Sequence, residues 1–272
     1  MTDVLPGRGS GCDPSSAREA RAVRAEDLAI AGLVPLSTVD WPGMLVATVF
    51  CQGCPWRCTY CHNQAILDPT TPGAVPFREL TALLERRRGL LDGVVLSGGE
   101  ATGRHAIVPA ARRIREMGFA VGLHTGGAYP ARLRTLLGVD RSGRRVSAPL
   151  VDWVGFDVKA APSGYEALTG RPGAYEKARA SLGLLLASGV DHELRMTVTP
   201  QLNDQVPAVI ESVGRAGGSH LVLQQARADG AGGDFAAQLA ALPDWPERFD
   251  SCVASARDAG EQLGVRVTAR SV

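Results

Sequence analysis

Aromatic residues are scarce in this chain of 272 residues, at 5% of the total. Neither sign of charge is in excess, because the formal net charge is +1. Nucleic acids and acidic membrane surfaces attract proteins with a strong basic excess, so we expect neither as a partner. No apolar run approaches the roughly 20 residues of a membrane span, and no signal-peptide pattern opens the chain. Hydrophobic residues make up 45% of the sequence, which predicts one sizeable core in a cytoplasmic protein.

Cysteine is also infrequent, yet four of the six cysteines lie between Cys51 and Cys61. Thiols at this density indicate metal ligands, disulfide partners or redox thiols. A structural zinc site usually places its second cysteine pair about 12 or more residues beyond the first, whereas three residues separate Cys54 from Cys58. The bacterial ferredoxin run has another spacing and ends in proline. Unpaired thiols in a metal loop also favour a reducing compartment.

Short apolar segments alternate with amphipathic helical patterns from residue 44 onward. Strands are predicted at residues 44–50, 94–96, 119–123, 151–156, 194–198 and 220–223. Helices are predicted at residues 75–88, 107–114, 130–137, 175–186 and 206–213. This alternation implies parallel strands joined by right-handed crossovers, and six units are too few for a closed eight-unit barrel. The prediction is an α/β fold, a partial (β/α)6 TIM-like open barrel with a short C-terminal helix-strand extension.

The domain boundaries follow from composition. Residues 1–27 are rich in Gly, Ser, Ala and Arg and are predicted to be a disordered tail, in which Cys12 is an incidental thiol. Residues 28–228 form the barrel, and residues 229–272 form an extension packed on it, with Cys252 on an apolar helix face. Residues 30–43 indicate turns around a short apolar piece, and the glycine-rich residues 227–235 indicate a flexible segment or a lid.

Distinctive motifs follow five of the six predicted strands. They are the cysteine loop, Ser97-Gly98-Gly99-Glu100, His124-Thr125-Gly126-Gly127, Asp157-Val158-Lys159 and Gln224-Gln225. Because the C-terminal ends of barrel strands meet on one face, where barrel enzymes carry their chemistry, we expect these motifs to lie together.

The C-x3-C-x2-C pattern of Cys54, Cys58 and Cys61, with Tyr60 before the third cysteine, resembles the radical S-adenosylmethionine (SAM) family. The resemblance implies that these thiolates bind three irons of a [4Fe-4S] cluster, whose fourth iron is open to the amino and carboxyl groups of SAM. Cys51 has two interpretations, a further ligand or redox thiol and a buried thiol at a strand end.

Further motifs resemble the SAM-binding parts of that family. The Gly98-Gly99-Glu100 segment corresponds to one that meets the SAM amino group; glycines let backbone approach a ligand, and a carboxyl or carbonyl oxygen accepts from ammonium. Ala101 stands where family members often have proline. Asp157 and Lys159 resemble a D-x-K motif that helps to hold SAM in glycyl-radical-enzyme activases, with a solvated ion pair as the alternative.

Three more residues complete the implied site. Arg195 resembles an arginine that approaches the SAM carboxylate, which its planar fork suits. The resemblance also assigns Tyr60 and Gln224 to cofactor binding. His124 stands where activases often have aspartate, so a structural histidine and a ligand contact both stay open.

Softer features narrow the resemblance over about residues 30–228. They are Val39-Asp40-Trp41-Pro42-Gly43, Cys61-His62-Asn63, Tyr165 to Gly170 and Leu223-Gln224-Gln225. These motifs resemble those of the anaerobic ribonucleoside-triphosphate reductase activating proteins. The resemblance implies that flavodoxin or ferredoxin reduces the cluster, that SAM is cleaved to a 5'-deoxyadenosyl radical, and that the radical takes hydrogen from a glycine of a large glycyl radical enzyme.

Two other functions remain open on the sequence. One is a radical SAM enzyme acting on a small molecule or peptide, such as a 7-carboxy-7-deazaguanine synthase type, because short barrels serve these groups as well. The other is a non-catalytic iron-sulfur or zinc module. A fold and a motif together do not fix a substrate.

Overall fold

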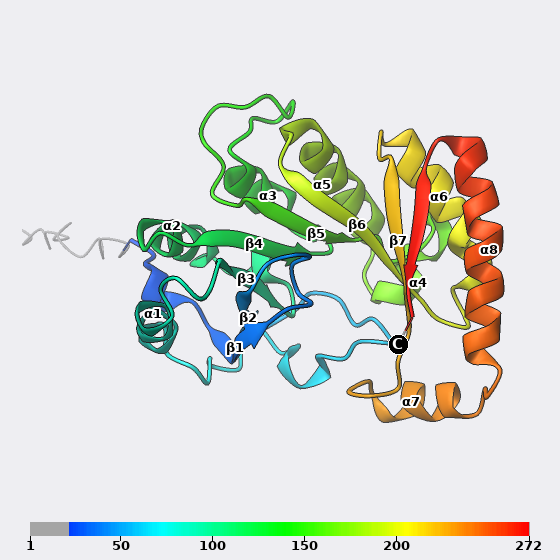
Figure 1. The fold of residues 1–272 in the computed structure, drawn as a ribbon, viewed down its shortest axis with the longest axis horizontal. Coiled ribbons are helices and arrows are strands. Elements are labelled where there is room, and N and C mark those ends of the chain that lie inside the picture. The colour runs from blue at the N-terminus through cyan, green and yellow to red at the C-terminus, as the bar shows by residue number, and fades with distance from the viewer. Residues whose placement is uncertain (1–21, 272) are drawn as a thin grey trace, which may run out of the picture.

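The structure, a computed structural model, describes residues 22–271, whose strands form one open sheet in the order β1 to β8 (Figure 1). The strands are β1 Ile30–Ser37, β2 Val46–Cys51, β3 Gly93–Gly98, β4 Ala120–Thr125, β5 Trp153–Asp157, β6 Asp191–Val198, β7 His220–Gln225 and β8 Arg266–Arg270. The helices are α1 Phe77–Arg86, α2 Ile107–Glu116, α3 Pro130–Leu137, α4 Tyr165–Thr169, α5 Ala174–Ser188, α6 Val206–Arg215, α7 Gly233–Ala240 and α8 Trp245–Leu263.

Strand pairing confirms the predicted α/β open barrel. Strands β2 to β7 pair in parallel with their sequence neighbours, as helical crossovers require. Strand β8 continues the series by pairing in parallel with β7, so the C-terminal extension lengthens the sheet. Within the described residues β1 and β8 are the two edges of the sheet, which leaves the barrel open on one side.

The prediction of turns around a short apolar piece at residues 30–43 is wrong for its first half, because Ile30–Ser37 is a strand antiparallel to β2. Pro35 lies within this strand. Proline is tolerated on an edge strand, where no ladder hydrogen bond needs its missing N–H. The register of β1 also shifts twice, between Ile30 and Gly32 and between Val34 and Ser37, as bulges at a barrel rim do.

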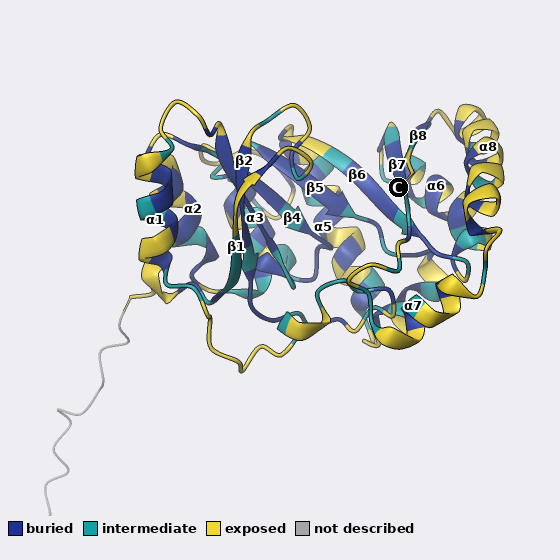
Figure 2. Cartoon of the chain, turned by 60° about the horizontal axis from the view of Figure 1, so that its bottom comes forward, coloured by how far each residue is buried: buried dark blue, intermediate teal, exposed yellow. Residues whose placement is uncertain are grey.

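The helices cover the outer face of the sheet and turn their apolar sides toward it (Figure 2). In α1 the buried positions are Phe77, Leu80, Leu83 and Leu84, a helical spacing. Most of the apolar core lies in this layer between sheet and helices. Burying it orients the strands and brings their C-terminal ends to one rim.

A second, smaller apolar cluster closes the inside of the barrel. The Trp41 ring stacks on Trp153 at 5.5 Å between centroids, and both side chains are buried. Trp41 also lies against Gly122, where an added Cβ would be 2.8 Å from the indole. The loop after β1 therefore folds back as a floor, and the space above it opens toward the rim.

Two predictions concern the ends of the chain: a disordered tail at residues 1–27, and a flexible segment or a lid at residues 227–235. Residues 1–21, with Cys12, lie outside the described residues. The described end of the predicted tail, a short turn at Ala25–Asp27, has Ala25 buried in the main core. The glycine-rich stretch at 227–235 leads into α7, which the sequence patterns did not indicate. None of the helices in residues 22–271 has the length and apolar character needed to cross a membrane.

Candidate active site

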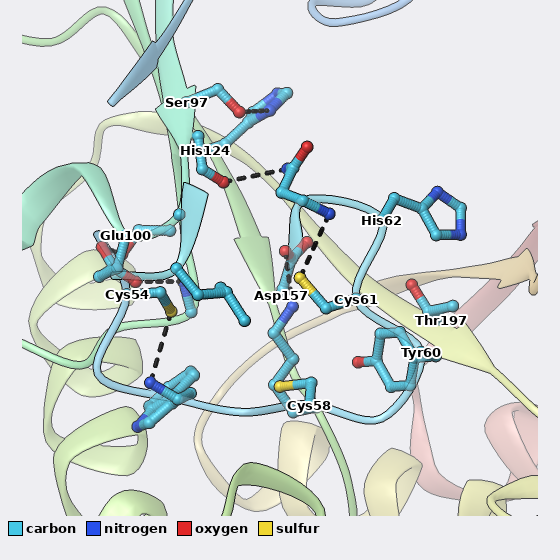
Figure 3. Close-up of a pocket in the computed structure, with 18 of the residues that line it drawn as sticks. Cys54, Cys58, Tyr60, Cys61, His62, Ser97, Glu100, His124, Asp157 and Thr197 are labelled. Carbon is cyan, nitrogen blue, oxygen red and sulfur yellow. Dashed lines mark hydrogen bonds and ion pairs between the residues drawn. The ribbon is translucent and has the colours of Figure 1, made fainter. Parts of the chain in front are cut away.

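A cavity of about 310 Å³ opens at the C-terminal rim of the strands (Figure 3). All the site residues predicted from the sequence line it. They are Cys54, Cys58, Tyr60, Cys61, Gly98, Gly99, Glu100, His124, Asp157, Lys159, Arg195 and Gln224. These residues come from a loop and five strand ends, so only the folded barrel brings them together.

The cysteine loop is held in place by backbone hydrogen bonds. The Gly53 N–H donates to Ile66 O at 2.7 Å, and the Cys54 N–H donates to Leu67 O at 3.0 Å. Gly53 has φ +94, a conformation that other residues rarely adopt. Cys51 is the last residue of β2 and has no solvent exposure, and burial raises the pKa of its thiol to about 12. Of the two interpretations of Cys51, its burial agrees with that of a buried thiol at a strand end.

The remaining three thiols of the loop face the cavity as partly exposed side chains. The sulfur of Cys54 accepts from the Trp56 N–H at 3.4 Å, and that of Cys61 accepts from the Asn63 N–H at 3.3 Å. Burial raises the pKa of Cys54 to about 12 and also raises that of Cys58. A bound metal group would lower these pKa values again by its positive charge.

A single zinc ion and an iron-sulfur cluster need different arrangements of cysteine ligands. On one tetrahedral zinc ion, with Zn–S bonds near 2.3 Å, ligand sulfurs would lie about 3.8 Å apart. Among residues 22–271, no three His, Cys, Asp or Glu side chains gather in this way around a single ion. The described cysteines are also free thiols rather than disulfides. Cys54, Cys58 and Cys61 line one cavity, and cysteine thiolates are the usual protein ligands of iron-sulfur clusters.

The Gly-Gly-Glu turn fits tightly against the cysteine loop. A Cβ on Gly98 would lie 2.2 Å from Cys51 N, and one on Gly99 would lie 2.4 Å from Gly53 O. The Glu100 N–H donates to the same Gly53 O at 2.9 Å. These glycines are therefore needed for the approach of two backbones, whatever binds in the cavity.

The Glu100 carboxylate is buried and already satisfied. It accepts from the Thr102 and Thr125 hydroxyls at 2.5 and 2.7 Å, and from the Gly126 N–H at 3.0 Å. Glu100 thereby ties the end of β3 to the end of β4. These donors occupy both oxygens of the Glu100 carboxylate.

Asp157 binds two cations at the wall of the cavity. It accepts from Arg195 Nε at 2.9 Å and from Lys159 Nζ at 3.0 Å. Burial alone would raise the pKa of Asp157, but the adjacent Arg195 and Lys159 charges hold it well below its usual value. The trio carries a net positive charge, which suits a ligand carboxylate. Its low exposure, 10% for the Arg195 side chain and 17% for that of Lys159, does not match a solvated ion pair.

His124 joins the cavity to the barrel floor. Its Nε2 lies 2.7 Å from Asp40 O and its Nδ1 lies 3.1 Å from Ser97 Oγ. Nε2 also lies 3.3 Å from Arg195 Nη1, which can only donate. The shorter contact with the Asp40 carbonyl, which can only accept, favours the proton on Nε2, with the Ser97 hydroxyl donating to Nδ1. Burial, and then the charge of Arg195, lowers the pKa of His124 to about 4. His124 is thus a neutral, hydrogen-bonded histidine that also lines the cavity.

The start of the C-terminal extension packs on the cysteine loop. The Phe235 ring of α7 lies 6.4 Å from that of Tyr60, and both side chains are buried. Lys159 Nζ lies 5.8 Å from the centre of the Tyr60 ring. The Tyr60 hydroxyl is buried without a hydrogen-bond partner among residues 22–271. Tyr60 therefore connects the extension to the charged wall.

The cavity also contains residues that sequence reasoning did not assign to it. Asp40, whose carboxylate accepts from Thr48 at 2.6 Å, reaches it from the floor. Asn63 Nδ2 donates to Gly98 O at 3.1 Å, which links the cysteine loop to the glycine turn. Thr197 lies two residues after Arg195 and hence on the same face of β6, a signal that the sequence did offer.

Comparison with known proteins identifies the family. A sequence model described as Radical SAM superfamily matches residues 48–213, more than half of the chain. A protein of Methanocaldococcus jannaschii, provisionally named a glycyl-radical enzyme activating enzyme, is 31% identical over 144 residues, which are 48% of this chain and 50% of that protein. The pre-heme d1 synthase of Dinoroseobacter shibae is 27% identical over 175 residues, 62% of this chain and 41% of that one.

Among solved structures, anSMEcpe with bound AdoMet and the Kp18Cys peptide superposes with a TM-score of 0.57. It is 16% identical and covers 80% of this chain and 61% of its own, so this likeness concerns the fold alone. The chain spans half or less of the length of the curated relatives just described. The family match, the cysteine loop and the open barrel show that this chain belongs to the radical SAM superfamily, whose members work with SAM and an iron-sulfur cluster.

Proposed function

We propose that this enzyme holds a [4Fe-4S] cluster on Cys54, Cys58 and Cys61 and generates a glycyl radical on a large partner enzyme. The observation that carries the proposal is that these three thiols share one cavity with a glycine turn and with the cationic trio of Asp157, Lys159 and Arg195. When bound and reduced, the cluster supplies the electron that cleaves SAM to a 5'-deoxyadenosyl radical.

The protein's own side chains bind and orient SAM in this proposal. Arg195 and Lys159 receive the carboxylate of the methionine part, and Asp157 keeps both cations in position. Carbonyl groups of the Gly98-Gly99 turn accept from the ammonium group, and Gln224 and Tyr60 complete the wall. The stacked tryptophans of the floor close the barrel beneath and keep water from a reactive ligand.

The open side of the barrel is the route by which a partner reaches the cavity. A glycine in an extended loop could enter between the β1 and β8 edges and approach SAM. The name of the M. jannaschii relative supports an activase. Anaerobic ribonucleotide reductase is the partner that the sequence motifs favour, with flavodoxin or ferredoxin as the electron donor. Free thiols in the loop favour the reducing cytoplasm as the place of work.

A second candidate is a radical SAM enzyme that acts on a small molecule or peptide. It is supported by the D. shibae relative, which is named a synthase and matches a longer part of this chain than the M. jannaschii protein does.

The first experiment tests the cluster. The protein is reconstituted anaerobically with iron and sulfide, reduced with dithionite in the presence of SAM, and assayed for 5'-deoxyadenosine. We expect wild type and Cys51→Ala to form it and Cys58→Ala to form none, with the Cys51 variant as the matched control. Zinc binding without SAM cleavage by wild type would overturn the proposal.

The second experiment separates the two candidates. Wild type, SAM and reductant are incubated with an anaerobic ribonucleotide reductase from the same genome, and an organic radical on the reductase is sought by electron paramagnetic resonance. The control reductase has its radical-bearing glycine replaced by alanine. A signal only with the intact glycine supports the activase. Turnover of a deazaguanine precursor with no radical on the reductase supports the second candidate.

A further inference from the structure

A second, outer cavity of about 250 Å³ lies behind the cysteine loop and is basic. Its polar lining includes three arginines and contains no carboxylate. The lining is formed by Gln52, Gly53, Cys54, Pro55, Arg57, Pro69, Gly103, Arg104, Tyr129 and Arg171. Cys54 lines both this cavity and the inner one, so a single side chain forms part of the wall between them.

Two of these arginines bind the outer side of the cysteine loop. Arg104 Nε donates to Gln52 O at 2.5 Å, and its Nη2 donates to Pro69 O at 3.1 Å. Arg171 Nε donates to Pro55 O at 2.8 Å. Because these acceptors are neutral carbonyl groups, the hydrogen bonds fix the guanidinium groups without neutralising their charge.

The charge of the face is left largely uncompensated by the protein. The Arg57 side chain is exposed and makes no hydrogen bond or ion pair within the described residues. Asp68 lies near enough to Arg57 to feel its charge, so this one carboxylate offsets part of the positive charge of the face. Beside the cavity, Arg132 stacks over the Tyr129 ring at 5.4 Å and adds a further cation.

We infer that this basic face, defined by Arg57, Arg104, Arg132 and Arg171, docks an acidic one-electron carrier protein of the flavodoxin or ferredoxin kind. The inference rests on the proposed function, because it requires a cluster on Cys54. In the docked complex one electron leaves the reduced carrier and enters the cluster, and no bond is made or broken.

Two features favour an electron carrier over other anionic partners. Electron transfer falls steeply with distance, and this face adjoins Cys54 from outside the cavity proposed for SAM. The carrier can therefore bind while SAM is in place and while the open side of the barrel is free for a substrate. The chain as a whole is nearly neutral, with a net charge of +1, so this basic face is a local patch, which suits a small acidic protein better than a nucleic acid.

Charge reversal at Arg57 tests the inference. We compare wild type, Arg57→Glu, Arg57→Lys and Arg257→Glu, the last being a matched charge reversal on the exposed side of α8. Binding of oxidised flavodoxin to the reconstituted protein is titrated at low and high NaCl, and 5'-deoxyadenosine formation is driven either by photoreduced flavodoxin or by dithionite. At low salt Arg57→Glu should weaken flavodoxin binding and the flavodoxin-driven rate on the order of tenfold.

The other arms define the outcome. Arg57→Lys and Arg257→Glu should resemble wild type, high salt should reduce the difference between variants, and the dithionite-driven rate should be equal in all four. The inference is overturned if Arg57→Glu binds flavodoxin as wild type does. It is also overturned if Arg57→Glu fails to activate the glycyl radical partner while its flavodoxin-driven formation of 5'-deoxyadenosine stays normal. Wild type that cleaves no SAM even with dithionite refutes the proposed function instead.

Discussion

The charged wall of the cavity makes a quantitative prediction about Asp157. The substitution Asp157→Asn keeps the size of the side chain and removes its charge. Arg195 and Lys159, whose side chains are only 10% and 17% exposed, are then left as neighbouring cations without a counter-ion. Breaking a fully buried pair costs about 3–5 kcal/mol. Because the Asp157 side chain is itself 29% exposed, we expect a loss of about 2–4 kcal/mol in unfolding free energy.

Urea denaturation of the cluster-free protein measures this loss, and a double-mutant cycle assigns it. Lys159→Met removes one of the two cations, so Asp157→Asn should cost less in the Lys159→Met background than in wild type. A coupling energy within about 0.5 kcal/mol of zero would refute the reasoning, since sites that do not interact add to that accuracy.

The same pair of proteins predicts a dependence on pH. The pKa of Asp157 is lowered in the folded protein, so its stabilising effect is present above its unfolded-state pKa of about 3.9 and is lost as pH falls below that value. Wild type and Asp157→Asn should therefore differ in stability at pH 7 and converge as the pH falls below about 4. A difference that stays constant over this range contradicts the ion-pair account.

Three further predictions concern the glycine turn, the floor and the buried histidine. Gly99→Ala would put a Cβ 2.4 Å from Gly53 O, so this variant should bind less iron on reconstitution. Gly183→Ala on α5 is the control, because no atom lies within 4 Å of its added Cβ, and it should bind iron normally. The measurement is the iron content per chain, and equal iron in the two variants would contradict the prediction. Trp41→Ala should cost about 3–5 kcal/mol in unfolding free energy, measured by urea denaturation, and a cost below about 1 kcal/mol would show that the floor is not packed. The pKa of His124 is lowered to about 4 in the folded state, so NMR should detect no titration of its ring between pH 5 and 8. Because the unfolded chain binds this proton more readily, the protein should lose stability as the pH falls from about 6.5 toward 4. A titration of His124 near pH 6.5 would contradict its burial.

Much of the barrel was predictable because parallel strands buried on the helix side leave short apolar runs with turn residues after them. The segments predicted around Val94, Val121 and Leu194 all lie in strands of the structure. Strand β1 was missed because its burial pattern is weak, with three exposed positions in succession, and because Pro35 reads as a turn. Only pairing with β2 makes an edge strand of it, and pairing is a property of the folded sheet.

The roles of single side chains were less predictable than their places. Sequence placed Glu100 at the cavity, and it lies there, but its carboxylate is used by Thr102, Thr125 and Gly126. Those partners come from the turn after β3 and from the end of β4, and no local pattern shows which donors a carboxylate will meet. His124 gives the same lesson, since its low pKa depends on burial and on the charge of Arg195, which is distant in sequence.

The position of Cys54 explains why this loop is both tightly held and accessible. Cys54 lines the inner cavity, where we propose that a cluster meets SAM, and the same residue lines the outer cavity among arginines. Gly53 lets the chain turn between these two environments, and the Gly98-Gly99 turn packs directly on it. A side chain larger than hydrogen at any of these glycines would push the loop away from the barrel. In the proposed function, the close packing that holds Cys54 for the cluster therefore also keeps it at the wall of the outer cavity.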